Sequence, residues 1–268
     1  MKVIIPTYKR LHTQVTYDNL HDKSNVWLAV REEEAEEASK ISPNVFVLDS
    51  HVSNFPETVE NICKRHKGER IVISDDDLKF GKIFKKEGSE WAKWTSGLAN
   101  AEEEHAMWAR INKYIDDGYA HGGFWIAGLA PKYYNDMINE HTNVNARYNN
   151  MKWYDLSAFD PDDIDWTTCV ATEDYYVALQ LIQKGFPSAV DRYYALSPKA
   201  SHSAGGCSTY RTVEVHNESQ RKLAEIYPDF VSLNKPNKNG YVTLRIDFKK
   251  AYKNYLDKKP GALEEFFV

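Results

Sequence analysis

The run from Arg70 to Leu78 constrains the fold of this chain more than any other feature. Its apolar stretch Ile71-Val-Ile73 is typical of a buried strand, and the consecutive carboxylates Asp75, Asp76 and Asp77 follow almost at once. Adjacent carboxylates repel one another and suit neither a strand nor a helix interior, so a nearby cation would offset their charge. Side chains two positions apart point the same way, so Asp75 and Asp77 can share that cation. A polar turn that caps the next segment uses the same residues, and the triplet by itself does not separate the two interpretations.

The composition indicates a folded domain of ordinary size. The chain has 268 residues, of which 42% are hydrophobic and 13% aromatic, enough for one large core or a core with an appended subdomain. No apolar run reaches the length of a membrane span, and we expect a cytoplasmic protein. The three cysteines, Cys63, Cys169 and Cys207, are too scattered for a disulfide framework or a sulfur-ligated zinc site. The net charge of −5 argues against indiscriminate binding of nucleic acid.

Strands and helices alternate regularly before the three carboxylates. Strands are expected at 2–6, 26–30 and 45–48, and helices at 13–21, 31–40 and 54–66. This alternation indicates parallel β-α-β units, in which ligands bind beyond the carboxyl ends of the strands. We therefore expect the turn Pro6-Thr-Tyr-Lys-Arg10 to lie beside Asp75 and Asp77.

A second acidic pair opens a helix in the other half of the chain. Residues 177, 178, 181 and 182 are apolar at helical spacing, and Gly185 is a stop signal. Thr172 is the expected cap, which puts Glu173 and Asp174 in the first turn. Carboxylates there complement the helix dipole, so a purely structural role is open at this stage.

The segment Ser201 to Arg211 combines residue types that a diphosphate site needs. His202 is a metal-competent imidazole, Gly205 and Gly206 let the backbone approach a ligand, and Arg211 carries a fixed positive charge. Taken singly, a histidine such as His202 is more often a surface or core residue than a ligand.

Ile4-Ile-Pro-Thr-Tyr-Lys-Arg10, followed by a strand that ends in Asp-x-Asp, resembles the nucleotide-sugar half of a GT-A glycosyltransferase. The resemblance implies an α/β fold with a mixed, mostly parallel central sheet flanked by helices, in which residues 1–78 bind the donor and residues 79–230 carry the acceptor and catalytic half. It also implies a UDP-sugar donor and a Mn²⁺ or Mg²⁺ ion that bridges its diphosphate. On the donor side the resemblance implies that Pro6, Thr7 and Arg10 line the nucleotide pocket and that Arg31 or Glu32 contacts the base. It further implies that Asp75 lies near the ribose and the metal, and that Asp77 is the direct metal ligand.

The same resemblance assigns roles in the second half. An acidic pair at the start of such a helix supplies the carboxylate that faces the acceptor, which makes Asp174 the first candidate for general base and Glu173 the second. His202 falls where GT-A enzymes have a third metal contact, and Arg211 would face phosphate. The sequence around Gly205 and Gly206 is not general among GT-A enzymes.

The unusual sequence around Gly205 and Gly206 points to a particular group of GT-A enzymes. The motifs Ser74-Asp-Asp-Asp-Leu78, Gly122 to Gly128, Thr172-Glu-Asp174 and 202–211 resemble the phage glycosyltransferases that modify hydroxymethylpyrimidines in DNA, relatives of the TET-associated group. The resemblance covers roughly residues 1–230. It implies transfer of a sugar to the hydroxyl of a 5-hydroxymethylpyrimidine, or to a sugar already attached to one.

Two basic stretches suit such an acceptor. Residues 235–259 hold eight Lys and Arg against two Asp, in a C-terminal extension, 231–268, that we expect to pack on the same domain. Lys79, Lys82, Lys85 and Lys86 are interleaved with aromatic residues, a combination that suits a phosphate backbone and an extruded base. A solvated helix face has the same composition, so the basic residues do not decide the acceptor.

Other functions remain open from the sequence. A GT-A enzyme with a polysaccharide or protein acceptor would share the donor site, and a nucleotidyltransferase would also use paired carboxylates. A nonenzymatic DNA-binding module is the third alternative, and the Asp-rich loop 160–165 is a weaker metal candidate. The identities of the sugar and the pyrimidine, base flipping, the stereochemistry and the oligomeric state are not determined.

Overall fold

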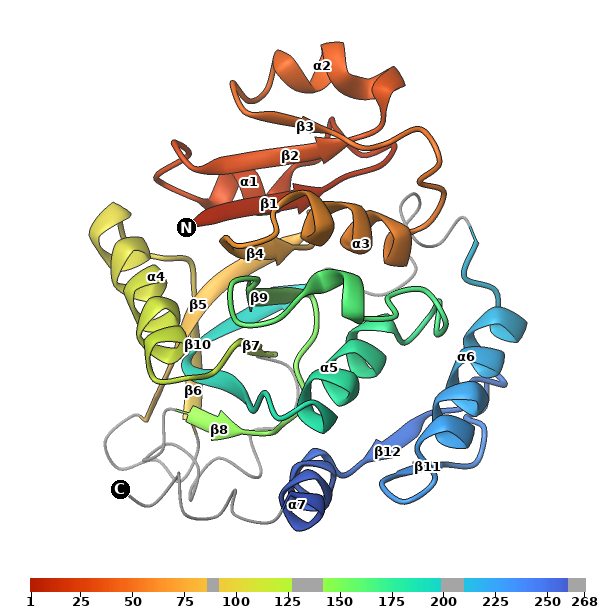
Figure 1. Ribbon diagram of the computed structural model, residues 1–268. Coiled ribbons are helices and arrows are strands. Elements are labelled where there is room, and N and C mark those ends of the chain that lie inside the picture. Colours follow the sequence, from red (N-terminus) through yellow and green to blue (C-terminus); the bar gives the residue numbers. More distant parts are fainter. Residues whose placement is uncertain (86–91, 127–141, 199–209, 260–268) are drawn as a thin grey trace.

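The computed structural model describes residues 1–85, 92–126, 142–198 and 210–259 (Figure 1). Its main sheet lies at the centre, and its strands are β1 (Lys2–Pro6), β2 (Val26–Val30), β3 (Val45–Val47), β4 (Arg70–Ser74), β5 (Leu78–Lys85), β6 (Ala92–Ser96), β7 (His121–Ile126), β8 (Thr142–Val144), β9 (Met151–Asp155) and β10 (Ser188–Pro198). The order across the sheet is β3-β2-β1-β4-β9-β7-β10-β5-β6, with β8 paired to β10.

The sheet is mixed, and most of its strands run in one direction. β1 to β4 are parallel neighbours, as the alternation of strands and helices predicts. β7, β10 and β6 run the same way, whereas β5, β8 and β9 run the opposite way. β9 is therefore an antiparallel strand in the middle of the sheet, directly beside β4. The expected α/β class with a mixed, mostly parallel sheet is confirmed.

The helices that cover the sheet are α1 (Val15–Asn19), the 3-10 turn η1 (Glu32–Glu34), α2 (Ala35–Ser39), α3 (Phe55–Arg65), α4 (Ala101–Asp116), the 3-10 turn η3 (Pro161–Asp163) and α5 (Glu173–Gln183). α3 begins as expected, because the Asn54 side chain accepts a hydrogen bond from the Glu57 amide at 3.0 Å and Pro56 lies in the first turn. The segment expected to be one helix at 31–40 is divided between η1 and α2.

Alternating side chains of β1 feed two cores on opposite faces of the sheet. Val3 and Ile5 pack with α1 and α4, whereas Ile4 packs with α3 and α5. In Figure 1, α4 lies to the left of the sheet, away from α3 and α5. This burial on both faces is why the strands read as nearly continuous apolar runs.

The C-terminal elements are α6 (Val213–Ile226), β11 (Val231–Leu233), β12 (Leu244–Ile246) and α7 (Phe248–Lys258). They form a third core with α5, in which Val231, Phe248 and Leu223 pack against Leu179. Gln183 Nε2 also donates a hydrogen bond to the Ala251 carbonyl. The segment 231–259 thus rests on α5, the helix that carries the acidic pair.

Two further expectations concern the whole chain. Cys63 and Cys169 are buried free thiols, in keeping with reduced structural cysteines, and Cys207 lies outside the described residues. Among the helices of the described segments, none has both the length and the apolar character needed to cross a membrane.

Candidate active site

The turn between β4 and β5 is held by two residues that the sequence does not single out. The Thr16 hydroxyl donates to the Asp75 carbonyl at 2.5 Å and accepts from the Leu78 amide at 2.9 Å. Asn150, just before β9, accepts from the Asp75 amide at 2.7 Å through its carbonyl and donates to Asp75 Oδ2 at 2.8 Å. Its φ of 60° lies in the left-handed region, which asparagine tolerates better than most residues. The Thr16 hydroxyl and the Asn150 carbonyl thus hold the backbone of the turn, and the Asn150 side chain orients the Asp75 carboxylate.

The three consecutive carboxylates have different partners. Asp76 is buried, and its oxygens accept from the Thr7 hydroxyl at 3.0 Å and from Arg10 Nη1 at 3.2 Å. The same Arg10 nitrogen lies 3.6 Å from Asp77 Oδ2. The turn after β1 and the turn after β4 are therefore in contact, as the parallel strands predict, and Asp76 is the residue that joins them.

Asp75 has the character of a carboxylate that needs a cation. Burial raises its pKa to about 7, while Lys152 and the hydrogen bond from Asn150 oppose the rise. The negative charges of Asp77 and Asp76 contribute smaller parts of this rise in pKa. Asp75 and Asp77 offer the hard oxygen ligands that Mg²⁺ or Mn²⁺ prefers, so the donor set fits such an ion.

That donor set is incomplete in the described segments. No group of three His, Cys, Asp or Glu side chains within them is placed to hold a metal. The third ligand expected from the sequence, His202, and the expected diphosphate contacts Gly205 and Gly206 lie outside the described residues.

Lys152 lies at the centre of the site. It belongs to β9, is only 2% exposed, and its Nζ is 3.5 Å from Glu173 Oε1. Burial by itself lowers the pKa of this amine, but the negative charges of Glu173, Asp174 and Asp75 more than offset that effect and raise the pKa. One buried ammonium group thus interacts with carboxylates from the end of β4 and from the start of α5.

The acidic pair forms the other side of the site. Glu173 is buried, and its Oε2 lies 3.6 Å from Arg211 Nη2. Burial and the neighbouring Glu173 raise the pKa of Asp174 to about 6, opposed by Lys152, Arg147 and Arg211. An Asp with this pKa is mostly ionised at neutral pH and is a stronger base than an exposed one.

Thr172 lies at the expected position before α5, but the prediction that its side chain caps the helix is wrong. Thr172 precedes the helix as predicted, but its ψ of 30° departs from the extended backbone typical of a capping residue, and its side chain accepts no capping hydrogen bond. The acidic pair in the first turn therefore complements the helix dipole without help from a hydroxyl cap.

The remaining donor-side residues lie around the turn after β1. Pro6 ends β1, and Arg31 follows β2, the next strand. The Arg31 guanidinium is 4.0 Å from the centre of the Tyr8 ring and donates to the Ser53 carbonyl at 2.7 Å. The contact with Tyr8 brings Arg31 to the 6–10 turn, whereas Glu32 begins η1.

Sequence reasoning missed Thr16, Asn150 and Lys152. Lys152 had a usable signal, because a lysine between Met151 and Trp153 is a charge inside an apolar, strand-forming run, and a buried charge is expensive unless it is paired. Thr16 and Asn150 act through hydrogen bonds to Asp75 and Leu78, which are far away in sequence, and neither residue belongs to a recognisable motif.

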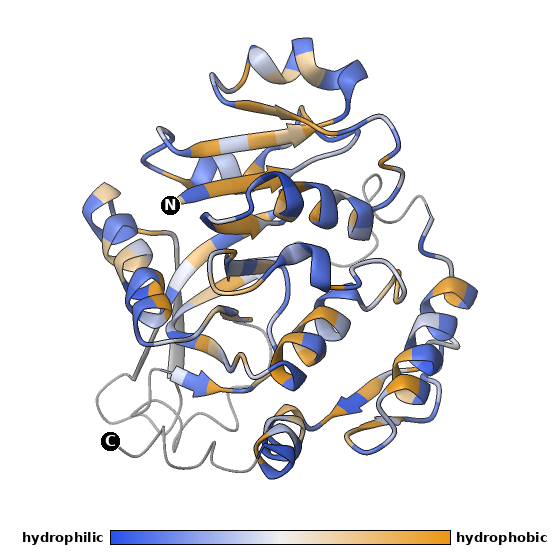
Figure 2. Ribbon diagram, in the orientation of Figure 1, coloured by the Kyte–Doolittle hydropathy of each residue, from blue (hydrophilic) through white to orange (hydrophobic). Residues whose placement is uncertain are grey.

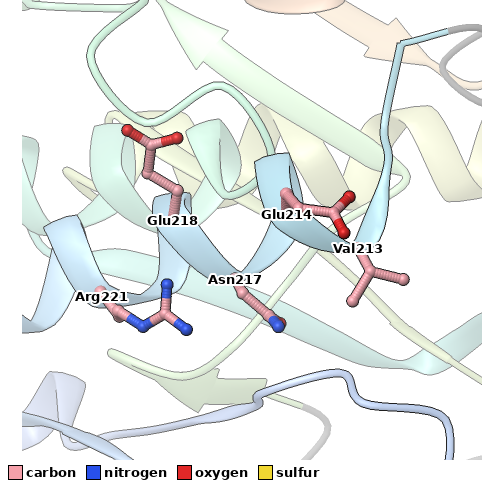
Figure 3. Close-up of a pocket in the computed structure, with 5 residues that line it drawn as sticks. All are labelled: Val213, Glu214, Asn217, Glu218 and Arg221. Atoms are coloured by element: carbon pink, nitrogen blue, oxygen red, sulfur yellow. The ribbon is translucent and has the colours of Figure 1, made fainter.

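Two other parts of the described structure were candidates for a site, the pocket on α6 and the acidic loop 160–165, and neither contains a similar set of catalytic or metal-binding side chains. A pocket of about 430 Å³ on α6 is lined by Val213, Glu214, Asn217, Glu218 and Arg221 (Figure 3). None of the expected site residues lines it. In the acidic loop 160–165, Asp160 and Asp162 are paired with Lys67, which makes that loop a solvated ion-pair cluster.

The sheet topology, together with carboxylates after β4 and at the start of α5, defines a glycosyltransferase of the GT-A type. Glucosyl-3-phosphoglycerate synthase from Mycobacterium tuberculosis, crystallised with Mn²⁺, UDP and phosphoglyceric acid, shares this fold, with a TM-score of 0.50 and 10% sequence identity over 92% of this chain and 86% of that chain. Residues 1–206 match the family model of the TET-associated glycosyltransferases. The chain belongs to this family and is a glycosyltransferase.

Two curated relatives are more similar in sequence. Both are named beta-glucosyl-HMC-alpha-glucosyl-transferase, one from Enterobacteria phage T6 and one from Enterobacteria phage T2. Each is 24% identical to this chain over 237 residues, which is 85% of this chain and 82% of the relative.

Proposed function

We propose that this chain moves a sugar from a UDP-sugar to a hydroxyl of a 5-hydroxymethylpyrimidine in DNA, or to a sugar already attached there, with a divalent cation bound. The arrangement around Lys152 carries the proposal, because the amine interacts with Asp75 on the donor side and with Asp174 on the acceptor side. The names of the phage relatives support the acceptor, and they favour a hydroxymethylcytosine that already bears glucose.

On the donor side, Asp75 and Asp77 would hold Mn²⁺ or Mg²⁺, with His202 as the proposed third ligand. When bound, the cation neutralises charge on the diphosphate as the glycosidic bond breaks. The turn containing Pro6, Thr7 and Arg10 would take the nucleoside and Arg31 its base, and Gly205, Gly206 and Arg211 would contact the diphosphate.

On the acceptor side, Asp174 is the proposed general base and Glu173 its buried neighbour. The bond between the anomeric carbon and the diphosphate oxygen breaks, and its electron pair leaves with UDP. A bond forms between that carbon and the acceptor oxygen, whose proton passes to Asp174. Lys152 keeps Glu173 and Asp174 compatible with burial by balancing their charge.

An acceptor in DNA places the proposed reaction in the cytoplasm, which is the host cytoplasm for a phage-encoded enzyme. The test is incubation with Mn²⁺ or Mg²⁺, a panel of UDP-sugars and three duplexes: plain, hydroxymethylated and glucosyl-hydroxymethylated. Digestion to nucleosides and mass spectrometry should show one added sugar on a modified duplex and none on plain DNA. Transfer to a glycan or protein acceptor with no adduct on any duplex would overturn the DNA assignment.

A further inference from the structure

The segment 231–259 differs in charge from the rest of the chain. It holds eight Lys and Arg against Asp247 and Asp257, a net charge of +6, whereas the whole chain has a net charge of −5. Everything outside the segment therefore carries −11. An acidic enzyme that acts on a polyanion needs a local positive surface, because long-range repulsion would otherwise slow the encounter.

Seven of the eight basic side chains of this segment are exposed to solvent and have no carboxylate partner among the described residues. Lys235 and Lys238 lie in the β11–β12 connection, Arg245 on β12, and Lys249, Lys250, Lys253 and Lys258 on α7, all of them exposed. Within the described ranges, none of these seven forms an ion pair with a carboxylate. By contrast, Lys40, Lys64 and Lys113 each pair with an acid one helical turn away.

α7 places positive charge where a helix favours negative charge. Its N-cap Asp247 accepts a hydrogen bond from the Lys250 amide, but the first turn itself has no acidic residue and contains Lys249 and Lys250. Cations at a helix N-terminus are unfavourable for the helix, so stability does not explain these two lysines. Lys249 and Lys253 are four residues apart and share one face of α7, whose hydrophilic side is turned away from α5 (Figure 2).

The segment that carries this basic surface packs against the first turn of α5, which holds the proposed base. The Phe248 ring, next to Lys249, lies 6.4 Å from the Tyr175 ring, next to Asp174. The exposed Arg147 guanidinium lies 4.9 Å from the centre of the same Tyr175 ring, and its charge acts on Asp174. Arg147 and the start of α7 thus both contact Tyr175, which follows the proposed base in the sequence.

We propose that the basic surface of 231–259, continued by Arg147, binds the phosphate backbone of double-stranded DNA and so brings a modified base to Asp174. The inference rests on the proposed function for its choice of polyanion. The surface lies beyond residue 206, where the family model ends, so family membership does not supply it. Each neutralised phosphate contributes salt-dependent affinity without reading sequence.

The test compares two triple variants. The first is Arg245→Gln, Lys249→Gln and Lys253→Gln, which leaves in place the hydrogen bond from Lys250 to the Asp229 carbonyl. The control is Lys40→Gln, Lys64→Gln and Lys113→Gln, which removes the same charge from the other part of the chain. Thermal unfolding checks that both variants fold. Fluorescence anisotropy with an unmodified 20-base-pair duplex then measures affinity from 50 to 300 mM NaCl.

The surface variant should bind the duplex at least about tenfold more weakly at low salt, and its log–log salt slope should be shallower by about 1 to 3, because each lost phosphate contact removes about 0.9. The control should bind like the wild type. Equal loss in both variants, an unchanged surface variant, or a wild-type protein that does not bind the duplex at 50 mM NaCl would each overturn the inference.

Sugar transfer separates this inference from the proposed function. Binding that depends on the surface, with no adduct on any modified duplex, would leave the surface standing and remove the proposed reaction. If the surface variant transfers sugar to modified DNA with the wild-type rate and KM, the proposed reaction stands and the inference about the surface is overturned. A short glucosyl-hydroxymethylcytidine acceptor should be used equally well by both variants, because it offers no duplex backbone.

Discussion

The ammonium group of Lys152 lies 3.5 Å from the carboxylate of Glu173, and both side chains are almost completely buried. The two residues come from the middle of the sheet and from the first turn of α5. The same amine interacts with Asp75 and Asp174, so the pair links the carboxylate after β4 with the acidic pair at the start of α5.

Replacing Lys152 with Met should destabilise the protein by about 3–5 kcal/mol, because Glu173 would remain as a buried charge without this partner. Urea unfolding measures the loss. In the double variant Lys152→Met with Glu173→Gln, both charges are gone, so part of the stability should return. Strictly additive free energies in this double-mutant cycle would show that the two groups do not interact.

Asp174→Asn should lower kcat for sugar transfer about 10²- to 10⁴-fold and leave UDP-sugar binding unchanged, because the amide cannot accept the proton. Calorimetry with the donor and a transfer assay give the two readouts. Loss of donor binding would reassign Asp174 to the donor side. NMR of the wild-type product gives its anomeric configuration, which shows from which face the acceptor attacks. Inversion would fit a base on the side opposite the diphosphate. Retention would limit Asp174 to orienting the hydroxyl.

Asp77→Ala should abolish metal-dependent turnover of the UDP-sugar, because one of the two carboxylates proposed to hold the metal is lost. Titration with Mn²⁺ should show weaker binding to this variant. The matched variant Asp76→Asn should keep metal binding and instead lower the melting temperature, since Asp76 accepts from Thr7 and Arg10. Wild-type turnover in Asp77→Ala would mean that another residue is the ligand.

The rate should depend on the ionisation of Asp174. Its pKa is raised to about 6, so kcat at saturating metal and donor should reach a plateau above that pH and fall about tenfold per unit below it. The folded state holds this proton more tightly than the unfolded chain does. The wild type should therefore lose stability relative to Asp174→Asn as pH rises from the ordinary pKa of 3.8 to about 6. A flat difference across that range would contradict the raised pKa.

Gly122→Ala should destabilise the protein by about 3 kcal/mol or more, because an added Cβ would lie 2.0 Å from the Ala189 carbonyl oxygen and 2.3 Å from the Trp153 ring. The control is Gly118→Ala, where φ is +93° but no atom is within 4 Å; it should cost about 1 kcal/mol from backbone strain. Thermal or urea unfolding compares the two. A mild effect at Gly122 would mean that β7 can move away from its neighbours.

Much of the structure of residues 1–78 follows from local patterns. The first four strands are short apolar runs separated by helical segments, and Asn54 and Pro56 mark the start of α3. Parallel strands put their carboxyl ends at one edge, which is sufficient to predict that the turn holding Thr7 and Arg10 meets the turn holding Asp76. The helical spacing after Thr172 likewise predicts α5 and its acidic first turn.

The amino-acid sequence by itself thus determined the first four strands, the helices α3 and α5, and the kinds of charge at their ends. Only the tertiary structure decided which charges share a buried environment. β9 enters the sheet beside β4 from about eighty residues further along the chain, and this pairing brings Lys152 and Asn150 to Asp75. Such contacts depend on strand order and register across the whole sheet, and the strength of a charge interaction depends on burial by all the neighbours. A local run of residues determines neither the order and register of the strands nor the burial of a charged side chain.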